Sequence, residues 1–73
     1  MATESLRDIR KTRNLSQAQI ARAAGITRVY YTLIENGQRS PSPRVLKAIA
    51  NVLGMSMDDV FALIGQRPAE VSQ

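Results

Sequence analysis

Helix-start and helix-stop residues recur at short intervals along this chain, and they limit its fold more than any other feature of the sequence. The start signals are hydroxyl residues that can cap a helix, and the stop signals are residues that adopt a positive φ at little cost. In chain order they are Ser16, Gly25, Thr27, Gly37, Ser42 followed by Pro43, Gly54 and Ser56. Ser16 also opens a capping box, because the Gln19 side chain can reach back to its amide. No stretch alternates apolar and polar residues over a useful length, so we predict an all-α fold of short helices.

Apolar spacing predicts five helices between these signals. They span about residues 3–13, 16–25, 27–36, 44–53 and from 56 onward, with Asn14 as a left-handed stop after the first. The apolar stripe of the fourth helix consists of Val45, Leu46, Ile49, Ala50 and Leu53. We expect the fifth helix to bury Val60, Phe61 and Ile64. The prediction is one domain over residues 1–65, followed by a flexible tail over residues 66–73.

The composition argues against several classes of function. The 73 residues contain no cysteine and no histidine, and the six carboxylates are scattered along the chain. The chain therefore lacks thiol ligands, the commonest metal ligand and the commonest general base, so we expect no enzyme, no metal and no cofactor. There is no apolar run of about eighteen residues and no apolar signal core, which predicts an intracellular, cytoplasmic protein without a membrane segment. No pocket for a small-molecule effector is evident from the sequence.

Positive charge is concentrated in the first two thirds of the chain. Residues 1–47 hold nine Lys and Arg against three carboxylates, a net charge of +6, whereas residues 48–73 hold one Arg against three carboxylates, a net charge of −2. This asymmetry is typical of a protein that presents a cationic face to a polyanion and uses a less basic part for packing or self-association. A basic surface that serves solubility alone is the alternative.

Two adjacent tyrosines in the segment "TRVYYTLIEN" need different environments, because neighbours on a helix cannot both face the core. At roughly 100° per residue, Tyr31 lies on the same side as Ile34, and we expect it in the core with Tyr30 on the flank. The opposite side mixes one cation with methyl groups: Arg28, Val29, Thr32 and Leu33. This face either packs on another apolar surface or meets thymine methyl groups in a DNA major groove.

The segment "QAQIARAAGITRVYYTLIEN", residues 17–36, resembles the helix-turn-helix unit of the phage repressor and Cro-like (XRE-type) family. The similarity lies in Ala21, Gly25 and a set of apolar packing positions. Those positions are Ile20, Ile26, Tyr31 and Ile34. The resemblance extends over about residues 5–61 and includes "LSQ", "IENGxRxPS" and "LxxIAxxLG" in that order. It implies a compact, lambda-repressor-like domain of five helices, with the helix-turn-helix at the second and third and the third helix in the major groove of DNA.

The same resemblance implies roles for individual residues. Base edges would be contacted by Arg28, Val29, Thr32 and Leu33, with Arg28 at a guanine and the two aliphatic side chains at thymine methyl groups. Position 33 is commonly polar or basic in the family, so Leu33 is a departure. Phosphate contacts are implied for Gln17, Thr27, Tyr30, Gln38, Arg39 and Ser40.

Some of these roles have alternatives. The Tyr30 ring has the alternative role of shielding the edge of the core, and Arg39 that of entering a neighbouring minor groove. In the family, Gln17 also steadies the base-contacting side chain opposite it. Arg10 and Glu35 match a pair of positions that links the first helix to the end of the third, and we expect this ion pair to fix helix orientation.

Together these features predict a sequence-specific regulator of transcription, a repressor that binds double-stranded DNA. Because one recognition helix contacts few base pairs, we expect a homodimer on a palindromic site. The apolar residues expected at the dimer interface are Met55, Met57, Phe61 and Leu63. The resemblance implies a bacterial or phage-encoded protein at the nucleoid. The alternatives are an antitoxin or restriction-modification controller of the same fold, and a protein-docking module that uses Val29 and Leu33.

Overall fold

The computed structural model describes residues 5–64, and the predicted tail over residues 66–73 lies outside this range. Residues 5–64 form five α-helices and no strand, which confirms the predicted fold class. The helices are α1 (Leu6–Thr12), α2 (Gln17–Ala24), α3 (Arg28–Glu35), α4 (Pro43–Leu53) and α5 (Met57–Ile64). None of the helices in the described range has the length and apolar character needed to cross a lipid bilayer.

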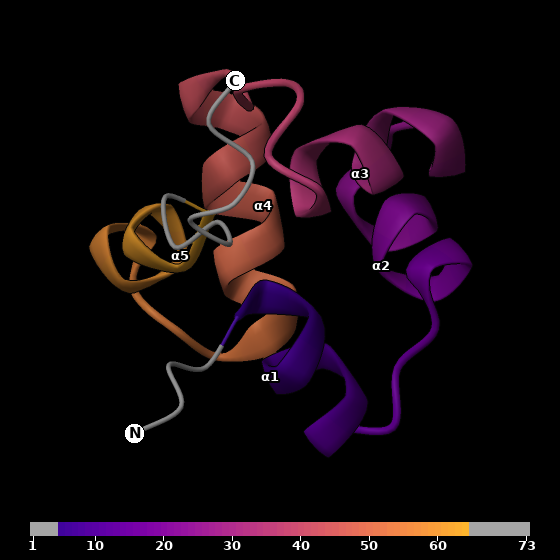
Figure 1. Cartoon of the computed structure of the whole chain (residues 1–73), viewed down its shortest axis with the longest axis vertical. Helices are drawn as coiled ribbons and strands as arrows, with labels where there is room; N and C mark the ends of the chain where they lie inside the picture. The colour runs from indigo at the N-terminus through magenta and orange to yellow at the C-terminus, as the bar shows by residue number, and fades with distance from the viewer. Residues whose placement is uncertain (1–4, 65–73) are drawn as a thin grey trace.

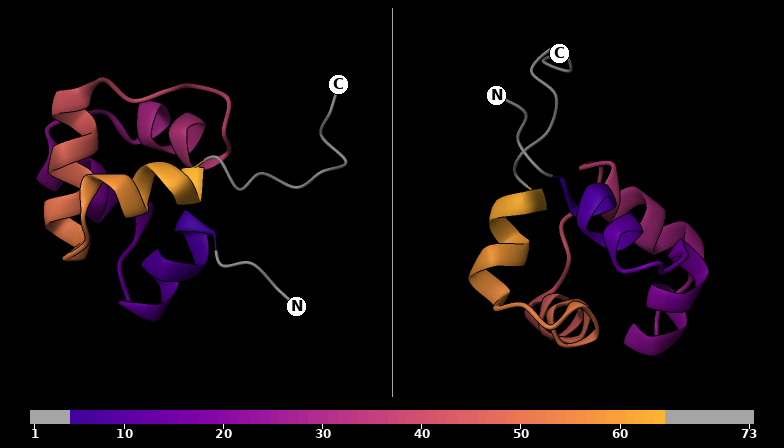
Figure 2. Two further views of the ribbon diagram at one scale, coloured as in Figure 1. Left: turned by 90° about the vertical axis from the view of Figure 1, so that its left-hand side faces the viewer. Right: turned by 90° about the horizontal axis from the view of Figure 1, so that it is seen from below.

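The longest helix, α4, lies at the centre of the arrangement. Figure 1 shows α5 on one side of α4 and the α2–α3 pair on the other, with α1 below them. The contacts between helices agree with this view, because α4 packs against α2 and α5, α2 packs against α3, and α1 packs against α5. In the right-hand view of Figure 2, α5, drawn in orange to yellow, again lies across the molecule from α2 and α3. The fold therefore has two separate outer sides, one formed by α3 and one by α5.

A hydroxyl residue precedes each of the described helices and accepts a backbone N–H from its first turn. These residues are Ser5, Ser16, Thr27, Ser42 and Ser56. The capping box at Ser16 is confirmed, because the Ser16 N–H donates to Gln19 Oε1 over 2.7 Å. Ser5 forms a second capping box with Asp8, which the sequence analysis missed. Since Ser5 has extended backbone angles, α1 begins at Leu6 and the predicted start near residue 3 is wrong.

The turn after α2 depends on a left-handed residue. Gly25 has φ 75°, and the Ile26 N–H beyond it donates to the Ala21 carbonyl over 2.9 Å. A Cβ atom at Gly25 would meet nothing within 4 Å, so glycine is needed there for its positive φ and not for lack of room for a side chain. Gly54 ends α4 in the same way with φ 70°, again with open space around it. The predicted left-handed stop at Asn14 is also confirmed, with φ 58°.

The core is apolar and receives side chains from every helix. Its buried members are Leu6, Ile20, Ala21, Tyr31, Ile34, Ile49, Ala50, Leu53 and Val60. Val45, Leu46 and Ile64 are partly buried and pack against this cluster. The prediction that Phe61 is buried is wrong, because its side chain is 61% exposed. Val60 occupies the core-facing position of α5, and the next residue, about 100° further round the helix, faces outward.

Candidate nucleic-acid interface

The α2–α3 unit is two short helices joined by a tight turn. Ala21 is buried in α2, which packs against α3 and α4, and Gly25 supplies the turn between α2 and α3. Thr27 then caps α3, since its hydroxyl oxygen accepts the Tyr30 N–H over 3.0 Å. The Thr27 side chain, for which the family resemblance implied a phosphate contact, therefore holds the first turn of α3 in place. The result is a helix that begins at the surface and presents one side outward.

The two tyrosines of α3 differ as the periodicity predicted. Tyr31 is fully buried, whereas Tyr30 is half-buried and packs against the edge of the core. On the outer side of α3, Val29 is 70% exposed and Arg28 is exposed, while Thr32 and Leu33 are half-buried. The outer side of α3 thus combines one cation with aliphatic groups, which are the chemical groups that meet guanine edges and thymine methyl groups in a major groove.

Glu35 is the centre of a group of hydrogen-bonded side chains, which we call the Glu35 network. Its other members are Arg10, Gln17, Tyr31 and Thr32. The Arg10 Nε donates to Glu35 Oε2 over 2.8 Å and its Nη2 donates to Oε1 over 3.2 Å, a two-pronged ion pair. The Tyr31 hydroxyl donates to Oε2 over 2.8 Å, and Gln17 Nε2 donates to Oε1 over 3.0 Å. The Thr32 hydroxyl in turn donates to Gln17 Oε1 over 3.2 Å. Within residues 5–64, no buried polar side-chain atom lacks a partner.

The Glu35 network joins three helices. Arg10 comes from α1, Gln17 from the first turn of α2, and the other members from α3. Arg10 also donates through Nη1 to the Leu15 carbonyl over 2.9 Å, which ties the segment between α1 and α2 to the same group. The pair of Arg10 and Glu35 proposed from the sequence thus lies in contact. The hydroxyl of Tyr31 and the amide of Gln17, which the sequence analysis did not connect with Glu35, complete the network.

The charges in this network are stabilised by hydrogen bonds. Burial by itself raises the pKa of Glu35, but the hydrogen bonds from Arg10, Gln17 and Tyr31 outweigh burial and bring that pKa below its usual value. The hydrogen bond to Glu35 raises the pKa of Arg10. Burial, and then the bond to the Glu35 carboxylate, raise the pKa of the Tyr31 hydroxyl. Glu35 is therefore an ionised acceptor at neutral pH, and the groups around it are donors.

Gln17 occupies a position between the network and the outer face of α3. Its amide contacts Glu35 on one side and Thr32 on the other. Gln17 thus hydrogen-bonds directly to a residue of α3, and its support of a base-contacting side chain, which the family implies, stays a prediction. The phosphate contact implied for Gln17 stays a prediction.

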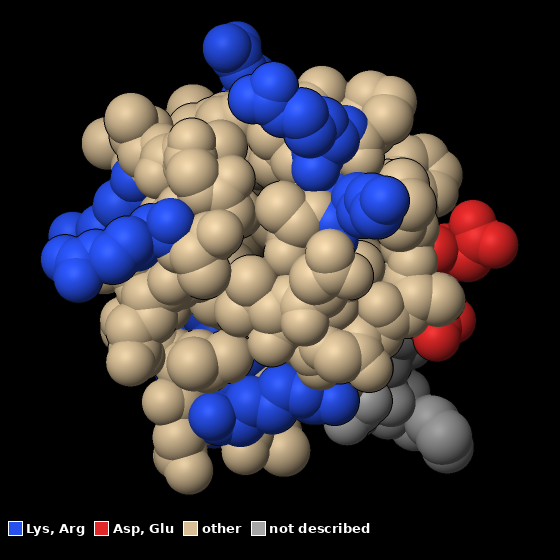
Figure 3. Space-filling model, turned by 180° about the vertical axis from the view of Figure 1, so that it is seen from behind, with Lys and Arg blue, Asp and Glu red and all other residues tan. Residues whose placement is uncertain are grey.

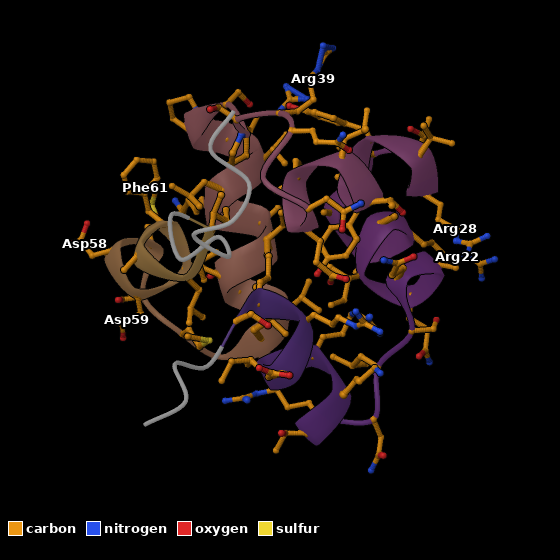
Figure 4. The ribbon with its side chains drawn as sticks, in the orientation of Figure 1. Arg22, Arg28, Arg39, Asp58, Asp59 and Phe61 are labelled. Carbon is orange, nitrogen blue, oxygen red and sulfur yellow. The ribbon has the colours of Figure 1, made fainter. Side chains whose placement is uncertain are left out.

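The acidic pair of α5 lies apart from the basic side chains of α2, α3 and the loop after α3. In Figure 4, Arg28 and Arg22 project from the α2–α3 side, Arg39 projects from the loop after α3, and Asp58 and Asp59 project from α5 on the far side. Figure 3 shows Lys and Arg spread over the rear face and acidic groups at its right-hand edge. The difference in charge between the two parts of the chain is therefore also seen in space, as a separation of Asp58 and Asp59 from Arg22, Arg28 and Arg39 (Figure 4).

The loop after α3 holds three of the predicted phosphate contacts on the surface. Gln38, Arg39 and Ser40 are exposed, and the Gln38 N–H donates to the Leu33 carbonyl over 2.8 Å, so the loop is fixed to the end of α3. Arg22 was not singled out from the sequence. It is exposed in the last turn of α2. Its position in the sequence, just before the turn that leads to Arg28, is the feature that could have identified it as part of the same basic surface.

On the opposite side of the fold, α5 exposes an aromatic ring. Phe61 points away from α4 in Figure 4. The other apolar residues proposed for a dimer interface, Met55, Met57 and Leu63, are partly buried and pack against the core. Residues 5–64 contain no group of three or more His, Cys, Asp or Glu side chains placed to hold a metal ion.

Comparisons with known proteins agree with this geometry. The model of the family described as "Helix-turn-helix" matches residues 6–60. Two relatives in Bacillus subtilis are named uncharacterized HTH-type transcriptional regulators: YqaE is 38% identical over the whole chain, and YqaF is 44% identical over 84% of it. The immunity repressor protein of Bacillus phage phi105 is 36% identical over 86% of the chain.

The relatives differ in how much of their own length is matched. The matched part is 61% of YqaE, 80% of YqaF and 42% of the phage repressor. No solved structure gives a significant match.

Proposed function

Because the chain belongs to the XRE-type helix-turn-helix family of DNA-binding transcriptional regulators, we propose that it is a repressor that binds a palindromic operator as a homodimer. The observation that carries this proposal is the outer side of α3. There Arg28 and the 70% exposed Val29 lie on a helix whose orientation is held from beneath by the Glu35 network. Side chains on a helix held in this way can meet base edges at defined positions in the major groove.

In this proposal the bases and the phosphates are contacted by different groups. Arg28, Val29, Thr32 and Leu33 contact bases, and Arg28 takes a guanine edge through its two-pronged guanidinium group. Gln17, Thr27, Tyr30 and the loop of Gln38, Arg39 and Ser40 contact phosphates, which supply affinity for any sequence. Arg22 joins this second group because it is exposed beside the turn before α3.

The homodimer follows from the small size of one recognition surface. A single α3 contacts few base pairs, and two copies about 34–36 Å apart would contact half-sites separated by one turn of the double helix. We place the interface on α5, where Phe61 exposes an aromatic ring on the side away from α3. The printed name of the phage relative, an immunity repressor protein, supports repression, although the match covers 42% of that protein. The role so described is non-enzymatic, needs no cofactor and is exerted on bacterial or phage DNA in the cytoplasm.

The experiment that tests the proposal is selection of bound duplexes from a randomised DNA pool at about 0.15 M salt, followed by sequencing. We expect enrichment of a palindrome with half-sites about 10 base pairs apart. Enrichment of a single, unrepeated half-site would contradict the dimer. No enrichment by the folded protein would contradict sequence-specific binding and would favour a protein-docking role for Val29 and Leu33.

The interface on α5 has its own test. Phe61→Glu places a charge at the exposed ring, and we expect it to convert the dimer to a monomer in sedimentation at micromolar concentration without loss of helix content. Ala23→Glu adds the same charge at an exposed position of α2 and is the matched control, which we expect to remain dimeric. A Phe61→Glu variant that stays dimeric contradicts this interface.

A further inference from the structure

The Glu35 carboxylate determines which way the Gln17 amide faces. An ionised carboxylate can accept hydrogen bonds but cannot donate one, and Glu35 is held in this form by its donors. Gln17 must therefore turn its NH₂ group to Glu35 Oε1, which lies 3.0 Å away. The amide oxygen, Oε1, then faces the other neighbour of Gln17, which is Thr32.

This orientation also determines the role of the Thr32 hydroxyl. The amide oxygen of Gln17 can accept but not donate, and Thr32 Oγ1 lies 3.2 Å from it. The hydroxyl must therefore donate its single hydrogen to Gln17. A threonine hydroxyl has one such hydrogen, so none is left for a base acceptor such as guanine O6 or thymine O4.

Two parts of Thr32 are then left for a base: the hydroxyl oxygen, which can only accept, from the amino group of adenine or cytosine, and the methyl group. Val29 lies three residues earlier on the same side of α3 and is 70% exposed, and Leu33 lies four residues after Val29. The three side chains form an aliphatic stripe along the outer face of the helix. In the major groove, the apolar group available to such a stripe is the C5-methyl group of thymine.

We propose that the Glu35 network, acting through Gln17, makes Thr32 a methyl-presenting residue, so that Thr32 and Val29 together select a thymine methyl group in each operator half-site. This inference rests on the proposed function and specifies the base chemistry of the same surface. In this arrangement Gln17 is a positioning residue, and donation of hydrogen bonds to base acceptors on this face is left to Arg28.

The test replaces each thymine of the selected operator, one at a time and symmetrically in both half-sites, by uracil, which lacks the methyl group and keeps all base-pairing atoms. Binding is measured by fluorescence anisotropy at about 0.15 M salt. We expect one position at which uracil weakens binding by about fourfold per half-site, the effect of removing one buried methyl group. Uracil outside the half-sites is the control and should have no effect.

Two variants of Thr32 assign that position to this residue. Thr32→Val keeps the methyl group and removes the hydroxyl, and we expect native affinity for the thymine operator. Thr32→Ser keeps the hydroxyl and removes the methyl group, and we expect it to bind the thymine operator about fourfold more weakly per half-site and to lose less than the native protein does when uracil replaces thymine, because Val29 is then the one remaining contact. Circular dichroism of both variants verifies that the fold is kept.

Two results would overturn the inference. They are equal binding of the uracil and thymine operators at every position, or a Thr32→Val variant that loses affinity while Thr32→Ser keeps it. Either result with an intact operator contradicts the methyl contact and leaves the proposed function standing. Failure to enrich any operator contradicts both.

Discussion

The two outer sides of this molecule hold their helices by different means. On one side, α3 is bonded to α1 and α2 through the side chains that surround Glu35. On the other side, α5 is held by the buried Val60 and by partly buried neighbours, and within residues 5–64 no side-chain hydrogen bond joins it to another helix. The charge also differs, because the first turn of α5 contains Asp58 and Asp59 whereas α3 begins with Arg28.

The difference shows what each side requires. Apolar packing is non-directional and tolerates small rotations of a helix, whereas hydrogen bonds between charged groups fix distance and angle. A helix whose side chains are to meet base edges needs a fixed rotation about its axis, and the Glu35 network supplies it. A helix that packs on an apolar partner needs exposed apolar surface, and on α5 the Phe61 ring provides it.

The largest expected effect is on the side of α3. Glu35→Ala leaves the guanidinium of Arg10 and the Tyr31 hydroxyl without their shared acceptor, and removal of one partner from a largely buried ion pair costs about 3 kcal/mol. We expect that loss in the free energy of unfolding from urea titration at pH 7. The matched control, Asp58→Ala in the first turn of α5, should cost less than about 1 kcal/mol. Equal losses for the two variants would contradict the contrast between the two sides.

Acid sharpens the same comparison. Because the pKa of Glu35 is lower in the folded protein than its usual value of 4.5, its contribution to stability is present above that value and is lost as the pH falls through the folded pKa. We expect the native free energy of unfolding to fall below about pH 4.5. Glu35→Gln should remove that part of the pH dependence. A native protein and a Glu35→Gln variant with parallel pH profiles would contradict this assignment.

The second largest effect concerns DNA. Arg28→Ala should weaken binding to the selected operator by about 2 kcal/mol and relax the preference at one base pair, because a two-pronged contact to guanine carries sequence information. Arg39→Ala is the matched control, and its loss should be similar for operator and random duplexes. Both residues are exposed, so stability should change little. If Arg28→Ala weakens all duplexes alike, its role as a base contact is wrong.

The adjacent tyrosines give the next largest effect. Tyr31→Phe removes a buried hydrogen bond to the ionised Glu35, and we expect a loss of about 1.5 kcal/mol in the free energy of unfolding. Tyr30→Phe removes a hydroxyl from a half-buried ring and should leave stability within about 0.5 kcal/mol. Urea titration of the two variants measures both. A larger loss for Tyr30→Phe would contradict the assigned environments.

Local signals in the sequence predicted the helices well because capping is a local interaction. The caps at Ser16, Thr27 and Ser42 and the stop at Asn14 depend on residues within one helical turn, and all are confirmed. The capping box at Ser5 was not predicted. Its second residue is an aspartate, Asp8, whereas the usual pattern has a glutamate or glutamine, as at Gln19 in α2.

Predictions that depend on tertiary packing were less complete. Periodicity predicted that both Val60 and Phe61 are buried, but only Val60 is, because two neighbours on a helix differ by about 100° and cannot both face the core. The convergence of Gln17 and Tyr31 on Glu35 depends on the crossing of α2 and α3, so the family resemblance supplied one ion pair and the structure supplied the rest. The contacts with bases and phosphates stay predictions, since they are formed with a partner molecule.

The smallest expected effect concerns the two glycine turns, after α2 and after α4, where similar losses of stability should have different consequences for DNA binding. Gly25→Ala and Gly54→Ala each force a Cβ atom into a positive φ, with no steric clash at either site, so we expect similar losses of about 1 kcal/mol in the free energy of unfolding. Their consequences for DNA should differ, because Gly25 sets the angle between α2 and α3 whereas Gly54 precedes α5. Any relief of backbone strain at Gly25 rotates α3 relative to Gln17, so operator affinity should fall for Gly25→Ala and be kept by Gly54→Ala. Urea titration and operator binding of both variants test this prediction. A loss of operator affinity confined to Gly54→Ala would contradict it. That result would mean that dimer formation through the α5 side controls DNA binding more than the orientation of α3 does.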